Sequence, residues 1–302
     1  MKKAIVVVGS LNMDLVVRTP RHPQIGETIL GSGFQTFPGG KGANQAVAAA
    51  RLGGRVRMIG RVGADAFGEA LMAAASQDGV DTSWIRRDPQ APSGVALITV
   101  DDAGRNTIVV ASGANMRLTP EDVSAAESAF DGAGVLLIQL ESPLPAVERA
   151  VQLARERGVH VVLNPAPAQP LTASFLSQVD TLIPNQNELE LLSGVAGTQA
   201  AVERLSALGV GDLIVTLGEE GVYVVAGEQQ TTIPAYPVDA VDTTAAGDAF
   251  LGAYAVALTE GMPALQAAAW SNAAAAISVT RRGAQPSLPT RVELDEFLAK
   301  FA

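Results

Sequence analysis

The sequence predicts an α/β protein with a three-layer α/β/α core, a mostly parallel sheet and a small antiparallel β lid. Short runs rich in β-branched residues alternate with stretches rich in alanine and leucine along most of the chain. This alternation is typical of a parallel sheet that helices cover on both faces. Two segments, residues 14–37 and 93–112, lack the helical pattern and are expected to form the lid. The chain of 302 residues is long enough to bury a large core.

The expected elements follow this alternation in order. Strands are predicted at residues 4–9, 56–60, 135–139, 159–164, 181–184 and 213–217. Helices are predicted at residues 42–52, 66–77, 120–130, 145–157, 200–208 and 249–258. Thr119 is a suitable N-cap for one of them, because Pro120 then occupies the first turn. Residues 261–280 carry no charge but are rich in alanine and poor in large apolar side chains, so they predict a buried helix rather than a membrane span.

The two segments without a helical pattern define the expected domain division. Residues 94–101 and 106–112 flank Asp102-Ala103-Gly104-Arg105, which is typical of a hairpin turn. An exposed sheet of this kind needs a cover, which a second copy of the chain can supply, and it can also close over a ligand. We therefore expect a core of residues 1–13, 38–92 and 113–302. The lid of residues 14–37 and 93–112 is expected to form the interface of a homodimer.

Charge and composition exclude several classes of function. The formal net charge is −10, so neither nucleic acid nor an anionic membrane is an expected partner. The absence of cysteine excludes disulfides, thiolate metal sites and a cysteine nucleophile. The two histidines, His22 and His160, lie in no motif typical of a zinc site or a catalytic triad. The first residues resemble the start of a signal peptide, but Asn12 and Asp14 interrupt the apolar run and no cleavage pattern follows. We therefore expect a cytoplasmic protein.

The most informative stretch of the chain is Asp242-Thr243-Thr244-Ala245-Ala246-Gly247-Asp248. It ends in a carboxylate at the threshold of the helix predicted at 249–258. The small residues before that carboxylate let backbone N–H groups approach an anion, and a helix N-terminus attracts negative charge. Asp248 beside such a site is a candidate base for a hydroxyl that attacks a phosphate. Taken alone, the stretch is explained equally well by an aspartate that caps or charges the first helical turn.

A glycine-rich turn leads into the first predicted helix, with the sequence Pro38-Gly39-Gly40-Lys41-Gly42-Ala43-Asn44-Gln45. Backbone exposed by glycines can approach a sugar or a phosphate, and Lys41 and Asn44 can donate to hydroxyls. The turn is not a P-loop, because the spacing of its glycines and the required Ser or Thr are absent. Residues 9–14 lack the G-x-G-x-x-G fingerprint of a nicotinamide dehydrogenase. In an extended backbone, the side chains of Asn12 and Asp14 point to the same side, so both could bind one polyol. A structural role in a turn explains the two residues equally well.

Polar residues or glycine follow several predicted strands, namely Asn12, Asp14, Glu141, Asn164, Asn185, Glu188 and Gly218. Ligands of parallel sheets lie beyond the carboxyl ends of the strands, and a row of donors and acceptors there suits a polyol and a phosphate. Asn185 and Glu188 have the spacing of a capping box, and the functional alternative places Glu188 near a magnesium ion. Gly218 and Gly221 can line a nucleotide pocket or form a simple hairpin turn.

In this combination and order, the motifs resemble those of the ribokinase family of sugar kinases, also called the PfkB family. The resemblance extends from Gly9 to about Arg291. Residues 39–46 look like the ribokinase branch, residues 242–248 look like the family's carboxy-terminal signature, and Asn185-x-x-Glu188 is a supporting motif. The resemblance implies a ribokinase-like fold and ATP-dependent phosphorylation of D-ribose at O5, giving D-ribose 5-phosphate and ADP. The alternatives are a kinase of the same family that acts on another sugar, a sugar acid or a nucleoside, and a sugar-binding sensor without catalysis.

The resemblance also implies a role for each candidate residue. Asp248 would take the proton from the 5-hydroxyl, and Ala245, Ala246 and Gly247 would form the anion hole for the transferred phosphoryl group. The ribose would be held by Asn12, Asp14, Gly39, Gly40, Lys41, Asn44, Glu141 and Asp248. The ATP site would be lined by Asn185, Thr216, Gly218, Gly221, Gly247 and Asn272. Mg²⁺ would lie near Glu188 through water. The ligands of K⁺ would be Asp242, Thr244, Ser278, Arg281, Gly283 and Ser287, several through backbone carbonyls. Glu219 and Glu220 depart from what the resemblance implies for a loop near the nucleotide. Two carboxylates there weaken nucleotide binding unless they point to solvent.

Overall fold

The core of the protein is a nine-stranded, mostly parallel sheet. The computed structural model describes residues 2–301, and the strand order is β13-β12-β11-β10-β9-β8-β1-β4-β5. All pairings from β11 to β5 are parallel, whereas β12 and β13 are antiparallel at one edge. The strands are β1 (Ala4–Val8), β4 (Arg55–Gly63), β5 (Asp81–Asp88), β8 (Ala133–Ile138), β9 (His160–Leu163), β10 (Thr181–Leu182), β11 (Asp212–Thr216), β12 (Val222–Ala226) and β13 (Gln229–Ile233).

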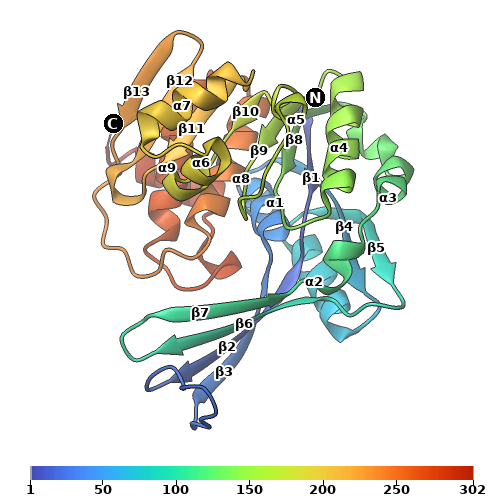
Figure 1. The fold of residues 1–302 in the computed structure, drawn as a ribbon, viewed down its shortest axis with the longest axis vertical. Helices are drawn as coiled ribbons and strands as arrows, with labels where there is room; N and C mark the ends of the chain where they lie inside the picture. The colour runs from blue at the N-terminus through green and yellow to red at the C-terminus, as the bar shows by residue number, and fades with distance from the viewer. Residues whose placement is uncertain (1, 302) are drawn as a thin grey trace.

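Helices cover both faces of this sheet, which confirms the predicted three-layer fold (Figure 1). Ile5 and Val7 of β1 enter one apolar cluster and Val6 and Val8 enter the other, because successive side chains of a strand point to opposite faces. The first cluster includes α1 (Lys41–Arg51), α2 (Ala66–Gln77), α8 (Ala246–Thr259), α9 (Ala264–Ser278) and α10 (Arg291–Leu298). The second includes α3 (Pro120–Ala125), α4 (Leu144–Glu156), α5 (Ala173–Leu176), α6 (Gln186–Ser193) and α7 (Thr198–Ala207).

Each strand and helix predicted from the sequence corresponds to an element of the structure, with ends that differ by a few residues. One prediction needs correction, because the helix expected at 120–130 divides into α3 and a 3-10 turn, η2 (Glu127–Phe130). The backbone leaves helical geometry at Ala126, where φ is −96° and ψ is 15°. This break lets Val123, Ala129 and Phe130 enter the same buried cluster. The strands β5 and β13 were not predicted, because their charged and polar residues obscure the strand pattern at the two edges of the sheet.

A second sheet of four strands projects from the core (Figure 1). Its order is β3 (Ser32–Gly39), β2 (Asn12–Thr19), β6 (Gly94–Asp101) and β7 (Asn106–Ala111). The outer pairings are antiparallel, as expected for a small antiparallel lid, while the central pair of β2 and β6 is parallel. One face of this sheet, with Val16, Ile98 and Ile108, lines a cleft of about 830 Å³ opposite the loop that contains Asp242. The opposite face carries Leu97 and Val109, which are 51% and 65% exposed.

Two further observations bear on the sequence-based expectations. Within residues 2–301, the structure contains no helix that combines the length and the apolar character needed to cross a membrane. His160 lies in β9, as predicted, and its Nε2 is 2.8 Å from the hydroxyl of Thr181 on the neighbouring strand. This contact gives His160 a structural role between two strands of the core.

Candidate active site

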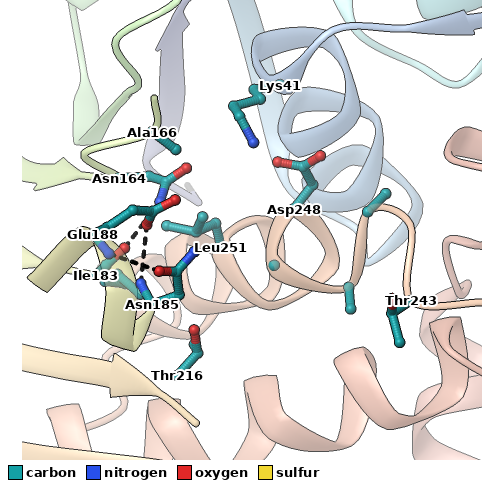
Figure 2. A pocket seen from close by; sticks show the side chains of 13 residues that line it. Lys41, Asn164, Ala166, Ile183, Asn185, Glu188, Thr216, Thr243, Asp248 and Leu251 are labelled. Atoms are coloured by element: carbon teal, nitrogen blue, oxygen red, sulfur yellow. Dashed lines mark hydrogen bonds between the residues drawn. The ribbon is translucent and has the colours of Figure 1, made fainter. Parts of the chain in front are cut away.

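The candidate active site lies at the carboxyl ends of the central parallel strands. The chain proceeds from β1 to β4 on one side of the sheet and later to β8 on the other, so β1 marks a topological switch point. Open α/β sheets bind their ligands at such a point. The residues lining the cavity, of about 220 Å³, are Lys41, Asn164, Ala166, Ile183, Asn185, Glu188, Thr216, Thr243, Ala245, Ala246, Gly247, Asp248 and Leu251. Figure 2 shows the ammonium group of Lys41 and the carboxylate of Asp248 facing each other at one end of this cavity.

Asp248 lies in the first turn of α8 and is 7% exposed. Its Oδ2 accepts a hydrogen bond of 3.0 Å from Asn44 Nδ2, and its Oδ1 accepts one of 2.9 Å from Gln45 Nε2. Burial raises the pKa of Asp248, while Lys41 and the two amides oppose that rise. The carboxylate is therefore bound to α1 across the site, whereas the N-cap position of α8 is occupied by Ala245, which makes no side-chain cap.

The backbone at the start of α8 is shaped to receive an anion. Ala245 adopts the left-handed conformation, with φ 60° and ψ 13°. The N–H of Ala246 donates to the carbonyl of Thr243 at 3.3 Å, but the N–H groups of Gly247 and Asp248 have no backbone acceptor in the described chain. A Cβ at Gly247 would meet no other atom within 4 Å, so this residue borders open space. Unpaired N–H groups at a helix N-terminus favour negative charge there.

The glycine-rich turn brings α1 into contact with the start of β2. Gly40 has φ 89°, and a Cβ at this position would lie 2.7 Å from the backbone nitrogen of Asn12. A Cβ at Gly39 would lie 2.4 Å from Asp14 Oδ2. Gly40 therefore requires glycine, while a side chain at Gly39 would displace the Asp14 carboxylate. The close approach of these backbones places Lys41 at the first position of α1 beside the acidic groups of the site.

Charged side chains surround this region and shift each other's pKa. Burial, Glu141 and Asp248 raise the pKa of Asp14 to about 7. Burial alone would lower the pKa of Lys41, but Asp248, Glu141 and Glu188 raise it above its ordinary value. Glu141 Oε2 accepts hydrogen bonds from the Ser10 hydroxyl at 2.5 Å and from the Lys41 N–H at 3.2 Å. A neutral ligand with several hydroxyl groups fits this mixture of donors and acceptors.

Of the candidate nucleotide residues, Asn185, Thr216 and Gly247 line the cavity. Asn185 caps α6: its Oδ1 accepts from the Glu188 N–H at 2.8 Å, and Glu188 Oε2 accepts from the Asn185 N–H at 2.9 Å (Figure 2). The capping box expected from the sequence is therefore present. Burial raises the pKa of Glu188, and Lys41 counteracts that effect.

The other candidate nucleotide residues lie outside the lining of this cavity. Gly218 begins a short 3-10 turn, η3 (Gly218–Glu220), in which Glu219 and Glu220 are exposed. A Cβ at Gly221 would lie 2.1 Å from the carbonyl oxygen of Ile233, so only glycine fits. Asn272, on α9, donates to the carbonyl of Pro234 at 2.8 Å.

The loop at Asp242 contacts the segment that follows α9. The N–H groups of Val241 and Asp242 donate to the carbonyl of Val279 at 2.7 and 3.1 Å. Asp242 Oδ2 accepts from the Gly283 N–H at 2.9 Å, and Oδ1 accepts from the N–H and hydroxyl of Thr244 at 2.9 and 2.6 Å. One carboxylate among backbone carbonyls is the kind of donor set that replaces the hydration shell of K⁺.

The remaining cation candidates use their side chains elsewhere. The buried hydroxyl groups of Ser278 and Ser287 donate to carbonyls three residues earlier, at 2.9 and 2.8 Å; Ser287 ends the short turn η4 (Gln285–Ser287). The Arg281 guanidinium pairs with Glu293 at 2.7 Å. The Arg281 side chain cannot bind a cation, so this residue can offer an ion only its backbone carbonyl, whereas each serine can offer a carbonyl or a lone pair of its hydroxyl oxygen.

The structure gives specific places to three residues that were not among the candidate site residues. Asn164 and Thr243 line the cavity, and the amide of Gln45 binds Asp248 directly. Gln45 follows Asn44 within the glycine-rich motif, and Asn164 follows β9 among the polar residues noted at strand ends. Both signals were present in the sequence, but neither specified which side chain would reach Asp248.

Comparison with known proteins assigns the chain to a family. The model of the family described as "pfkB family carbohydrate kinase" matches residues 2–291. The ribokinase of Haemophilus influenzae is 45% identical over 99% of both chains, and the deoxyribokinase of Salmonella typhi is 37% identical over 98% of both. The structure of Arabidopsis thaliana ribokinase complexed with ribose and ATP superimposes on this chain with a TM-score of 0.91 at 34% identity, and the match covers 99% of both chains. The chain therefore belongs to the pfkB family of carbohydrate kinases.

Proposed function

We propose that this protein transfers the γ-phosphoryl group of ATP to O5 of D-ribose, giving D-ribose 5-phosphate and ADP. The observation that carries the proposal is the buried carboxylate of Asp248, bound by two amides at the anion-accepting start of α8, with Lys41 opposite. The similarity to ribokinases over the whole chain supports the same reaction. Phosphoryl transfer depends mainly on alignment and on neutralisation of charge, which this arrangement can supply.

In the proposed mechanism, the sugar binds between β2 and α1 with its 5-hydroxyl beside Asp248. Asn12, Asp14, Gly39, Gly40, Lys41, Asn44 and Glu141 are its proposed partners. Asn44 Oδ1 is buried without a hydrogen-bond partner within residues 2–301, and a sugar hydroxyl would satisfy this acceptor once binding gives it access. Asp248 then accepts the proton of the 5-hydroxyl as O5 attacks phosphorus. The backbone of residues 245–247 and the ammonium group of Lys41 stabilise the charge on the phosphoryl oxygens.

In the same proposal, ATP lies along the side of the cavity formed by Asn185 and Thr216, which contact it. Gly218, Gly221 and Asn272 contact the part of ATP that extends beyond the cavity. The exposed positions of Glu219 and Glu220 allow both carboxylates to remain in water. Across the described residues, no group of three or more His, Cys, Asp or Glu side chains could hold a metal ion. A single carboxylate such as Glu188 still fits Mg²⁺, which commonly keeps several waters and binds substrate phosphates.

The ions would act on charge and on loop geometry. Mg²⁺ neutralises phosphate charge when it is bound. K⁺ fits the Asp242 loop and the segment at 278–287, which are already joined through Val279 and Gly283. Because the same loop leads directly to residues 245–247, its rigidity determines the direction of the N–H groups that receive the phosphoryl group.

A second candidate substrate is a deoxy sugar. The similarity to a deoxyribokinase, at 37% identity over nearly the whole chain, makes 2-deoxyribose the specific competitor. Charged groups gather around the proposed sugar position, which favours a small ligand rich in hydroxyl groups over a nucleoside, although Phe37 and aliphatic side chains line the adjoining cleft.

The proposed function is tested by ADP release with a panel of D-ribose, 2-deoxy-D-ribose and other sugars, with and without K⁺. We expect the highest kcat/KM with D-ribose and activation by K⁺ relative to Na⁺. Asp248→Asn should bind ribose but lose turnover by about 10²-fold or more, the scale of a missing general base. Near-normal turnover of Asp248→Asn would exclude the proposed base. A higher kcat/KM for another sugar would replace ribose as the substrate.

We also propose that residues 14–37 and 93–112 act as a lid and join two copies of the chain. The exposed apolar side chains of Leu97 and Val109 on the face turned away from the core support a second copy as their cover.

A further inference from the structure

Behind Asp248, two buried glutamines form a chain of hydrogen bonds that ends on its carboxylate. Gln139, which follows β8, donates from Nε2 to Gln45 Oε1 at 2.5 Å. Gln45, on α1, donates from Nε2 to Asp248 Oδ1 at 2.9 Å and to Asn164 Oδ1 at 3.4 Å. Both glutamines are 0% exposed. Neither side chain is therefore available to a substrate.

The direction of these hydrogen bonds sets the orientation of the Gln45 amide. The amide nitrogen of Gln45 faces two acceptors, the Asp248 carboxylate and Asn164 Oδ1, and the amide of Asn164 is itself fixed because its Nδ2 donates to the Ile183 carbonyl at 3.0 Å. Gln45 Oε1 therefore points the other way, where Gln139 Nε2 donates to it. The reverse orientation would place two donors against each other at Gln139 and an acceptor against the carboxylate at Asp248. A donated hydrogen bond favours the ionised form of a carboxyl group.

The packing leaves a place for Gln139 but little freedom. A Cβ at Gly9 would lie 2.1 Å from Gln139 Oε1, so the glycine makes room for this amide. Gln139 Oε1 has no hydrogen-bond partner in the described part of the chain. A buried polar atom without a partner is unfavourable for stability, and an apolar side chain would avoid this penalty. The amide at this position is thus better explained by its contact with Gln45 than by the stability of the core.

We propose that Gln45, supported by the hydrogen bond from Gln139, is a positioning residue that turns Asp248 Oδ1 into the protein and leaves Oδ2 as the oxygen that receives the substrate proton. The proposal rests on the proposed role of Asp248 as the base. Gln45 occupies Oδ1 from a fully buried position, while Asn44, which holds Oδ2, is 6% exposed. The base is therefore held by two amides of one helix, one on the protein side and one on the substrate side.

Other charged groups act on the same carboxylate and set the background for a pH experiment. Those that influence Asp248 or are influenced by it are Lys41 on α1, Glu141 after β8, Asp14 on β2 and Glu188 on α6. None of them is altered by a substitution of Gln45 or Gln139. A change in the pH profile of such a variant therefore reports on the amide chain.

The test compares Gln45→Met and Gln139→Met with the unaltered enzyme. Methionine keeps the length and approximate volume of glutamine but removes the amide donor. For Gln45→Met we expect the acid limb of the kcat profile to move upward by about one pH unit and kcat at pH 7 to fall about 10-fold, the scale of a lost hydrogen bond to a charged group. KM for ATP should change less than about twofold, as the nucleotide side is untouched. Gln139→Met should shift the acid limb in the same direction by a smaller amount.

Thr181→Val is the matched control, because it removes the hydrogen-bonding hydroxyl of another fully buried residue away from the site. It should lower stability without moving the acid limb. An unchanged pH profile of Gln45→Met, with Asp248→Asn inactive, would overturn the positioning role and leave the proposed function intact. Turnover by Asp248→Asn would instead overturn the proposed function. Should Gln45→Met fail to fold, an unchanged pH profile of Gln139→Met would overturn the proposal by itself.

Discussion

At the scale of single residues, Ala245 is the position where the backbone departs most clearly from local preference. Among residues 2–301 it is the one residue other than glycine with a positive φ, 60°. The left-handed conformation costs an L-residue with a Cβ about 1–2 kcal/mol. Backbone strain of this kind gathers at functional sites, and Ala245 immediately precedes the N–H groups proposed to receive the phosphoryl group.

Ala245→Gly should therefore stabilise the fold and weaken catalysis. The free energy gained by relief of backbone strain exceeds the entropic cost of a more flexible unfolded chain. We therefore expect the free energy of unfolding to rise by about 0.5–1 kcal/mol. A more mobile N-cap should lower kcat several-fold. Urea unfolding and steady-state kinetics check these values. Ala246→Gly is the control, since this residue has helical geometry and the same change there should destabilise by about 0.5–1 kcal/mol. Equal destabilisation by both changes would contradict strain at Ala245.

At the scale of elements, the site depends on the close contact of α1 with α8. Lys41, Asn44 and Gln45 lie on α1, whereas Asp248 lies on α8. At Gly252, one turn after Asp248, a Cβ would lie 2.5 Å from the Cβ of Ala48 and 2.7 and 2.8 Å from backbone atoms of α1. The absence of a side chain at Gly252 thus sets the separation of the two helices that carry the base and its partners.

Gly252→Ala should push α8 away from α1 and impair both stability and activity. Overpacking destabilises by about 1–3 kcal/mol, which the better helix propensity of alanine offsets only in part. A displaced base should lower kcat by about 10-fold or more. Thermal unfolding and kinetics measure both effects. The double variant Ala48→Gly/Gly252→Ala removes the clash with the Ala48 side chain and should recover part of each loss. Recovery should be incomplete, because the close contacts with the α1 backbone remain. A stable single variant with full activity would show that the helix separation is not critical.

At the scale of the whole molecule, the four-stranded sheet leaves apolar side chains without a cover in a single chain. Leu97 and Val109 are directly paired across β6 and β7 and point away from the core cleft. Adjacent exposed apolar side chains on a projecting sheet are typical of an interface. The same sheet forms the wall of the cleft opposite Asp242, so its position also affects access to the sugar side of the site.

Val109→Asp should prevent association of two chains. A charge at the centre of the proposed interface would be buried without a partner, so sedimentation equilibrium should give the mass of one chain for this variant and of two chains for the unaltered protein. Val292→Asp is the control, because Val292, on α10, has the same 65% exposure as Val109. A single-chain mass for the unaltered protein would exclude the proposed dimer.

Much of the fold was predictable because the relevant signals are local. The alternation of β-branched strands with alanine-rich helices predicts a parallel sheet covered on both faces, and the nine-stranded sheet has this form. The hairpin turn at 102–105 is visible in the residues themselves and joins β6 to β7. The split of the helix at Ala126 was not predicted, because packing against the core outweighs local propensity there. The edge strands β5 and β13 were not predicted either, because pairing with β4 and β12 holds their polar sequences in the sheet.

The candidate site divides in the same way. The sequence alone determined the fold class and the order of the glycine-rich turn, the Asn185–Glu188 cap and the stretch ending in Asp248, since each is a contiguous pattern. Only the tertiary structure decided which groups surround that carboxylate. The partner amide of Gln45 is 203 positions away from Asp248, and Gln139 is 94 positions away from Gln45. Contacts of this length depend on the order of strands in the sheet and on the close approach of α1 and α8, which no local pattern specifies.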